Sequence, residues 1–107
     1  MLETLYVSEP RDVVLEGLKD DATGSYINSA TITGQVRTSG DSITAGSRVG
    51  STFSLSYIAS SNGNYRGTFS AADAASLTEG TTYWLWVSAT NYTLRRIACK
   101  AIYREKT

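Results

Sequence analysis

Histidine is absent from this chain of 107 residues, and cysteine and proline each occur once. Without histidine, the chain lacks the usual general base near neutral pH and the commonest protein ligand of metal ions. A single cysteine can form neither a disulfide nor a thiolate zinc site within one chain. We therefore expect no enzymatic activity, no cofactor and no bound metal ion.

Long apolar runs and a basic leader are also missing. The apolar runs are only a few residues long, whereas about 20 apolar residues are needed to span a bilayer. The amino terminus, MLETLYVSEP, has no basic region followed by an apolar stretch. These features predict a chain that is made in the cytoplasm and does not contact a membrane, and the length predicts a single domain.

The charge is balanced overall but unevenly distributed. Ten Lys and Arg residues face ten Asp and Glu residues, yet residues 1–30 sum to −4 and the last fourteen residues sum to +4. Such polarity bears on association rather than on fold. Two interpretations are open: the two ends lie side by side and neutralise each other in one subunit, or they face neighbouring subunits.

Alternation of apolar and polar residues predicts strands. Between Ala30 and Arg37, apolar residues alternate with Thr, Gln and Arg, which is the pattern of a half-buried strand. One helical turn is expected between Ser70 and Leu77. Further strands are expected at residues 2–7, 11–17, 52–59, 64–70, 82–90 and 94–104, with turn-forming residues between them. About seven short strands at this spacing predict an all-β fold, a single antiparallel β-sandwich of the immunoglobulin-like kind.

The first predicted hairpin joins residues 52–59 to residues 64–70. A three-residue loop, Ser61 to Gly63, keeps the apolar side chains of both strands on one face. This register pairs Tyr57 with Gly67, so that an aromatic ring covers the bare backbone of a glycine.

The second predicted hairpin turns at residues 91–93. A loop with an odd number of residues pairs Leu85 with Cys99 and Val87 with Ile97, because it keeps these apolar side chains on one face. Cys99 is then a small core residue and not a nucleophile.

The other face of this second hairpin carries Trp84 and Trp86 beside Arg96 and Lys100. Lys100 is expected opposite Trp84, within reach of a cation–π contact. Either another segment of the chain covers the tryptophans, such as the N-terminal strand, or they are displayed to a partner. The second interpretation is consistent with the over-representation of Trp and Arg in interface hot spots, and both interpretations stay open.

Other groups of polar residues predict little chemistry. Asp20, Asp21 and Thr23 could offer oxygens to a calcium ion, but a turn capped by acidic side chains fits them better. Nucleophile motifs, phosphate-binding loops and runs of metal ligands are missing. Basic residues near the C-terminus are balanced by acidic ones elsewhere, so nucleic acid is not an expected partner.

Several runs of residues resemble known β-rich proteins. The runs ATITGQV at 30–36, FSLSY at 53–57, NGNYRGT at 62–68 and LTEGTTY at 77–83 resemble the immunoglobulin-like or carboxypeptidase-regulatory-like sandwich. More narrowly, GL at 17–18 and TGSYINSAT at 23–31, followed by the last two of those runs, are similar to small structural proteins of tailed-bacteriophage morphogenesis clusters. The resemblance covers about residues 11–104. It implies a repeated position on a virion, at the neck between portal and tail, on the capsid or along the tail, and no catalytic residues.

These observations predict a non-enzymatic structural protein of a tailed-phage virion, made in the bacterial host. Its expected partners are portal, capsid, neck or tail subunits and copies of itself, in a symmetric array. Residues 1–10 are expected to form an N-terminal arm or edge strand that can add to a neighbour, and residues 11–107 the sandwich domain. The expected interface comprises Leu2, Leu5, Tyr6, Trp84, Trp86, Arg96, Lys100 and Arg104. The alternative function is a carbohydrate-binding or adhesion module, in which Trp84 and Trp86 stack on a sugar.

Overall fold

The structure is a computed structural model that describes residues 3–20, 22–89 and 92–103. Within these residues the chain is all-β, and each predicted strand and the predicted helical turn are confirmed. The elements are β1 (Glu3–Tyr6), β2 (Arg11–Leu15), β3 (Ile32–Arg37), β4 (Arg48–Tyr57), β5 (Tyr65–Phe69), α1 (Ala71–Ala74), β6 (Thr82–Ala89) and β7 (Tyr92–Ile102).

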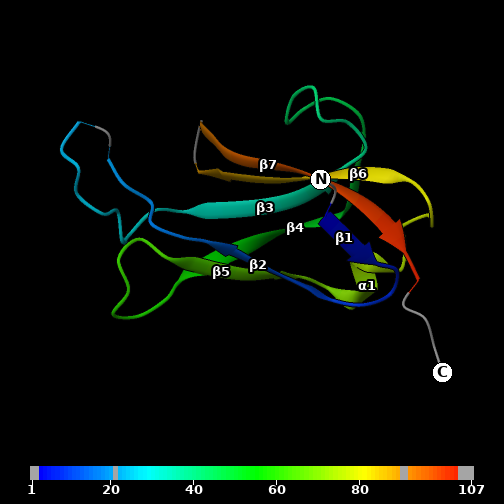
Figure 1. Ribbon diagram of the computed structural model, residues 1–107, viewed down its shortest axis with the longest axis horizontal. Helices are drawn as coiled ribbons and strands as arrows, with labels where there is room; N and C mark the ends of the chain where they lie inside the picture. Colours follow the sequence, from blue (N-terminus) through cyan, green and yellow to red (C-terminus); the bar gives the residue numbers. More distant parts are fainter. Residues whose placement is uncertain (1–2, 21, 90–91, 104–107) are drawn as a thin grey trace.

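One mixed sheet contains the seven described strands, in the order β1–β7–β6–β3–β4–β5–β2 (Figure 1). Neighbouring strands are antiparallel, except that β1 runs parallel to β7. The predicted purely antiparallel arrangement is therefore wrong. Parallel neighbours need a long connection, and the rest of the chain supplies it between these two strands.

The sheet turns over on itself at β4. This strand pairs with β3 from Arg48 to Leu55, and then with β5 at Ser56 and Tyr57. Figure 1 shows β7, β6 and β3 along one side and β5 and β2 along the other. The result is a nearly closed, barrel-like sheet rather than a clear sandwich of two sheets, because a single long strand belongs to both sides.

The core lies between these two sides. In β3 the predicted alternation is confirmed, because Ile32 and Val36 are buried and the polar residues between them are half-buried. Each fully buried large apolar side chain contributes roughly 1.5–3 kcal/mol to stability. The largest fully buried side chains are Tyr65, Phe69, Leu5, Ile32, Leu85, Val36, Val87 and Cys99.

The helix α1 begins immediately after a capping residue. Ser70 is its N-cap, and the Ser70 Oγ accepts a hydrogen bond of 3.2 Å from the backbone N–H of Asp73. The buried Ala74 anchors the helix to the core. In the described part of the chain, no helix has the length and apolar character needed to cross a membrane.

The β4–β5 hairpin differs from its predicted register by two residues. Tyr57 pairs with Tyr65 rather than with Gly67, and the connection is longer than three residues. A 2.8 Å hydrogen bond from Ile58 N to Asn64 O continues the pairing by one residue and leaves residues 59–63 as the loop. A shift of two residues keeps every side chain on its predicted face. The ring that covers a glycine is that of Phe53, opposite Gly34.

The β6–β7 hairpin is also shifted by two residues. Leu85 pairs with Ile97, and Cys99 pairs with Tyr83 instead of Leu85. Towards the turn, the register changes after Val87 and leaves Leu94 as a bulged residue. The sequence predicted a loop with an odd number of residues in order to keep the apolar side chains of both strands on one face. The bulge at Leu94 has the same effect. Cys99 is confirmed as a core residue, with 1% of its surface exposed.

Candidate functional site

The outer surface of β3, β4, β6 and β7 brings tryptophan and cationic side chains together. Across the sheet, Trp84 lies opposite Arg37 on β3, and Arg37 lies opposite Arg48 on β4. In the next row, Trp86 lies between Gln35 on β3 and Arg96 on β7. We call this surface the tryptophan face and define it by Arg37, Arg48, Trp84, Trp86, Arg96 and Lys100.

The loop 38–47 covers part of the tryptophan face. The indole Nε1 of Trp86 donates a 3.2 Å hydrogen bond to the carbonyl oxygen of Ser39. Gly40 lies so close to Trp84 that a Cβ atom there would come within 2.4 Å of the ring. Trp86 is therefore only 4% exposed, whereas Trp84 is half-buried. The covering segment is this loop and not the N-terminal strand, so Trp86 has little exposed surface in the single chain, and its interface role stays a prediction.

Arg96 is stacked against both indole rings. Its guanidinium carbon lies 5.1 Å from the ring centroid of Trp84 and 5.8 Å from that of Trp86. One guanidinium N–H group also donates to the carbonyl oxygen of Gly40. The predicted cation–π contact of Lys100 is thus made by Arg96 instead, because the two-residue shift places Lys100 opposite Thr82.

Arg37 connects the loop 38–47 to the sheet through hydrogen bonds. Its guanidinium donates to the carbonyl oxygens of Ala45 and Gly46, both at 3.1 Å, and to the side chain of Gln35 at 2.9 Å. These bonds fix a positive charge beside Trp84 before any partner arrives. The neighbouring Arg48 is exposed, so the face combines fixed and freely accessible cations.

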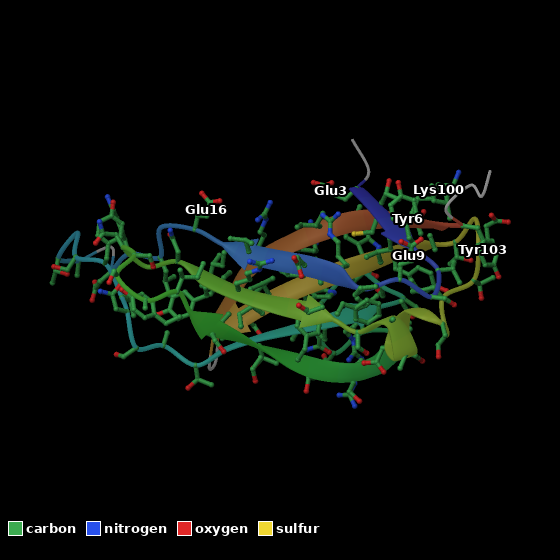
Figure 2. All side chains as sticks on the ribbon, turned by 90° about the horizontal axis from the view of Figure 1, so that it is seen from below. Glu3, Tyr6, Glu9, Glu16, Lys100 and Tyr103 are labelled. Atoms are coloured by element: carbon green, nitrogen blue, oxygen red, sulfur yellow. The ribbon has the colours of Figure 1, made fainter. Side chains whose placement is uncertain are left out.

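The N-terminal part of the predicted interface has a different position. Leu5 is 1% exposed and belongs to the core of the single chain, so it offers no surface while β1 is docked, and its interface role stays a prediction. Tyr6 is half-buried and Lys100 is exposed. Figure 2 shows both at the end of the molecule where Glu3 and Glu9 also lie. Leu2 and Arg104 lie outside the described residues.

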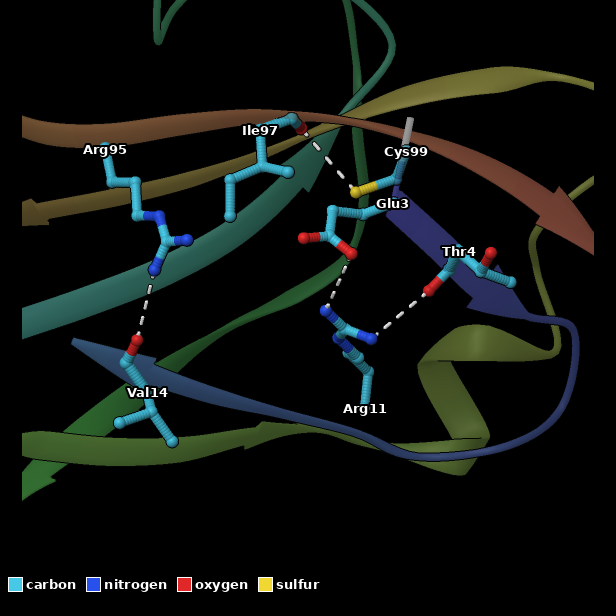
Figure 3. A network of polar contacts seen from close by, with 7 residues as sticks. All are labelled: Glu3, Thr4, Arg11, Val14, Arg95, Ile97 and Cys99. Carbon is cyan, nitrogen blue, oxygen red and sulfur yellow. Dashed lines mark hydrogen bonds and ion pairs between the residues drawn. The ribbon is translucent and has the colours of Figure 1, made fainter. Parts of the chain in front are cut away.

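Beside this end, the edge strand β2 approaches the other edge of the sheet, which is formed by β1 and β7 (Figure 3). We call the line between β2 on one side and β1 with β7 on the other the seam. Arg11 on β2 donates to the carbonyl oxygen of Thr4 at 3.5 Å and lies 3.8 Å from the carboxylate of Glu3. Arg95 on β7 donates to the carbonyl oxygen of Val14 at 3.3 Å. One of the two interpretations of the uneven charge, that the two ends lie side by side, agrees with the pairing of β1 with β7, but sequence reasoning did not identify Arg11 and Arg95 as the residues that make the contacts. The excess of basic residues after position 94 was the available signal.

Cys99 lies at the seam, on β7 beside Glu3 of β1 (Figure 3). Its thiol donates a 3.5 Å hydrogen bond to the carbonyl oxygen of Ile97. Burial raises the pKa of Cys99 to about 11, because the thiolate would lose its hydration. The thiol is thus kept protonated and covered while the seam is closed.

The opposite end of the molecule is built from the loops 16–31 and 58–64. The Asn64 side chain accepts a hydrogen bond from Gly17 N, and the Asn28 side chain accepts one from Gly63 N, both 2.8 Å long. The Tyr65 hydroxyl donates to Ile27 O at 2.7 Å. The NGNYRGT run therefore acts by fixing a long loop onto its neighbour.

The expected acidic turn is confirmed at Asp20. Its side chain accepts a 2.8 Å hydrogen bond from Ala22 N, and its carbonyl oxygen accepts one of 2.7 Å from Gly24 N. Asp21 lies outside the described residues. Among the described residues there is no group of three or more His, Cys, Asp or Glu side chains placed to hold a metal ion.

The tryptophan face is chemically suited to contact with another protein surface. It presents fixed positive charge beside a half-exposed aromatic ring, and arginine makes strong charge-assisted hydrogen bonds with carboxylates. The sequence matches no protein-family model, and no curated protein matches it. The function is therefore inferred from this face and from the order of the strands.

Proposed function

We propose that this chain is a non-enzymatic structural protein of a tailed-phage virion, which binds other virion subunits through the tryptophan face. The observation that carries the proposal is the contact of Arg96 with Trp84 and Trp86 on a rigid sheet. Trp and Arg supply most of the energy in many protein interfaces. Side chains that are fixed before binding lose little further conformational entropy when they bind.

The order of the strands supports an immunoglobulin-like domain within this proposal. If β2 to β7 are taken as strands B to G, then β4, β5 and β2 correspond to the D, E and B neighbours of one immunoglobulin sheet. β3, β6 and β7 correspond to the C, F and G neighbours of the other. At the start of β6 the hydroxyl of Tyr83 accepts a 2.8 Å hydrogen bond from Thr78 N, five residues upstream. This contact has the form of the tyrosine corner found in such domains.

The virion position is supported by the sequence resemblance to small proteins of phage morphogenesis clusters. A subunit that is repeated on a particle needs surfaces that bind defined neighbours and do not bind other molecules non-specifically. Zero net charge with a localised cationic face suits that need, because attraction is confined to one surface. Portal, capsid, neck or tail subunits with acidic surfaces are the partners we propose.

The carbohydrate-binding alternative is less well supported by the geometry. Stacking on a sugar requires an open aromatic ring face. Here Gly40 and Arg96 lie against the ring of Trp84, and Trp86 is buried beneath the loop 38–47. A sugar would have to displace both the arginine and the loop.

The proposal is tested with virions made from the genome that encodes the chain. We expect Trp84→Ala and Arg96→Glu to lower the copies of the chain per particle at least about tenfold, because a hot-spot residue contributes 2 kcal/mol or more. The matched control is Arg66→Glu, which changes an exposed arginine of β5, away from the tryptophan face, and should leave incorporation unchanged. Quantitative mass spectrometry of purified particles measures the copy number, and circular dichroism of each purified variant checks folding.

Two results would overturn the proposal. One is the absence of the chain from wild-type particles. The other is equal incorporation of the folded Arg96→Glu variant and the wild type. If the purified chain instead bound surface polysaccharide of the host, and Trp84→Ala abolished that binding, the adhesion alternative would replace it.

A further inference from the structure

We propose that β1 is exchanged between two copies of this chain, so that β1 of each copy pairs with β7 of the other in a closed dimer. The inference rests on the seam and on the segment between β1 and β2. It does not involve the tryptophan face, so it goes beyond the proposed function and can fail independently of it.

The contacts that hold β1 in place can be supplied equally well by a second copy. Leu5 is 1% exposed and Val7 is 5% exposed, and both belong to the core. The backbone of Val7 donates a 2.8 Å hydrogen bond to the carbonyl oxygen of Ile102, which continues the pairing of β1 with β7. Exchange would break these contacts in one copy and make the same contacts in the other.

Across the seam, the contacts that Arg11 makes with β1 are long and exposed. β1 is an edge strand of four residues, and Arg11 contacts it through Thr4 and Glu3 at the long distances of 3.5 and 3.8 Å. The side chains of Arg11 and Glu3 are 37% and 50% exposed. Exposed ion pairs of this kind contribute little to stability. The seam is therefore a path by which β1 can leave the sheet.

The hinge between the two strands is strained when β1 is docked on its own copy. Ser8 has a φ of 64°, which is unfavourable for a residue with a side chain. Pro10 follows two residues later, and it favours an extended conformation for Glu9. A hinge that opens to extended backbone would release the strain at Ser8, and it would break the hydrogen bonds from Ser8 N to Ala74 O and from Glu9 N to Tyr6 O. Short hinges under strain favour strand exchange.

The length of the hinge restricts the form of the dimer. Because Val7 moves with β1, four residue steps separate Val7 from Arg11, and they span at most about 14 Å when fully extended. The seams of the two copies must therefore face each other. The same contact is then made twice around a two-fold axis, which gives a closed dimer and not an open chain.

Site-specific disulfide trapping tests the exchange directly. Thr4 and Lys100 are directly opposite each other on β1 and β7. In a Cys99→Ala background, one chain carries Thr4→Cys and a second carries Lys100→Cys, and the two are mixed at high concentration and oxidised. We expect a disulfide-linked heterodimer on a non-reducing gel, because β1 of the first chain then lies on β7 of the second.

A collision control accompanies this mixture. Thr4→Cys is mixed with Ser56→Cys, which places a thiol at an exposed position of β4 that does not pair with β1. Strand exchange predicts at least a tenfold higher yield for the 4–100 mixture than for the 4–56 mixture. Equal yields in the two mixtures would overturn the proposal, as would a chain carrying both Thr4→Cys and Lys100→Cys that forms only internal disulfides at every concentration.

Variants of the hinge and the seam give a second readout. We expect Ser8→Gly to reduce the dimer fraction, because the docked hinge is no longer strained. We expect Arg11→Ala to raise the rate at which a thiol reagent modifies the buried Cys99 by about three- to tenfold. Arg66→Ala, which removes another exposed and paired arginine, should leave that rate unchanged. If Ser8→Gly and Arg11→Ala behave as the wild type does, β1 is permanently docked and the proposal is wrong. Arg96→Glu should leave exchange intact, which separates this proposal from the proposed function.

Discussion

The sheet turns over at β4 and nearly meets itself again at the seam, and these two sides of the barrel are held by different interactions. At β4, backbone pairing connects β3 through β4 to β5, with an irregularity in the register between Val49 and Phe53. At the seam, the arginine side chains of Arg11 and Arg95 reach carbonyl oxygens of the facing strand. One side is closed by main-chain hydrogen bonds, and the other by arginine side chains that lie over the buried Leu5 and Val13.

This difference separates what holds the fold from what can move. Backbone pairing is retained under most substitutions, and it is supported at β4 by buried side chains such as Leu55 and Phe69. The arginine contacts depend on two side chains and on ionic strength. The β4 side should therefore determine the stability of the domain, whereas the seam should determine how often it opens.

The largest expected effect lies on the β4 side, at Gly63 in the β4–β5 loop. Gly63 has a φ of 71°, and a Cβ atom there would lie 2.5 Å from the carbonyl oxygen of Leu18. We expect Gly63→Ala to lower the free energy of unfolding by roughly 3 to 4 kcal/mol, because it adds backbone strain and displaces the packed loop. Urea unfolding measures the loss.

Gly80 provides the matched control for that variant. Its φ is 85°, but nothing lies within 4 Å of a Cβ atom placed there. Gly80→Ala should therefore show only the backbone strain, about 1 to 2 kcal/mol. Equal losses for the two variants would mean that the contact between the loops 16–31 and 58–64 contributes nothing.

The next effect lies at the seam and depends on pH. Burial raises the pKa of Cys99 to about 11 from its ordinary value of 9.0. Between pH 9 and 11 the unfolded thiol ionises while the folded one stays protonated, so the free energy of unfolding should fall as the pH rises. This difference between the pKa values of the folded and unfolded thiol corresponds to roughly 2 to 3 kcal/mol.

Cys99→Ala isolates this contribution from the other groups that titrate at alkaline pH. The difference in unfolding free energy between the wild type and this variant should decrease from pH 8.5 to pH 11. A difference that stays constant over this range would show that the thiol is already open to water, and that the seam covers it poorly.

Most of the strands could be predicted from the sequence, whereas their registers could not. Alternation determines which face of a strand is apolar, and both hairpins kept their predicted faces. It does not distinguish registers that differ by two residues, because such a shift leaves every face unchanged. The length of the β4–β5 loop and the bulge at Leu94 decide the register, and both depend on contacts with distant segments.

The candidate site was also predicted only in part, because local sequence patterns do not show how distant segments fold over it. The sequence placed Trp84, Trp86 and Arg96 on one face, and the structure brings them together there. It gave no sign that the loop 38–47 would fold over Trp86, because this depends on Ser39 and Gly40 reaching across the sheet. The mixed sheet escaped prediction because β1 and β7 are separated by most of the chain.

A smaller effect than that of Cys99 is expected at Tyr65, again on the β4 side. Its hydroxyl donates to Ile27 O at 2.7 Å and accepts from Ala30 N at 3.1 Å. Tyr65→Phe should lower the free energy of unfolding by about 1.5 kcal/mol, because both backbone groups lose a partner in a partly buried place. Tyr103→Phe is the matched control, since Tyr103 is 60% exposed, and it should be neutral. Equal stability of the Tyr65→Phe variant and the wild type in urea would show that water replaces the hydroxyl.

The smallest expected effect concerns an ion pair between β5 and β2, two strands that are already joined by backbone hydrogen bonds. Arg66 on β5 contacts the carboxylate of Asp12 on β2 at 2.6 Å, and the hydrogen bond from Arg66 is the main reason why the pKa of Asp12 is lowered from 3.8. A lowered pKa contributes stability that is present above pH 3.8 and is lost as the pH falls through the folded pKa. Both side chains are more than half exposed, so this contribution should be small and should vanish in 1 M salt.

Arg66→Ala tests this view of the two sides. Carboxyl NMR should show the pKa of Asp12 rising toward its ordinary value, because the hydrogen bond that chiefly lowers it is removed, while the urea midpoint at pH 7 barely changes. Arg95→Ala should behave differently, because Val14 O at the free edge of β2 then loses its hydrogen-bond donor, and opening of the seam should become measurably faster by hydrogen exchange. If Arg66→Ala accelerated exchange at β2 as much as Arg95→Ala does, the arginines of the seam would be ordinary surface residues. The closure of the barrel on that side would then have to come from the core packing of Leu5 and Val13 alone.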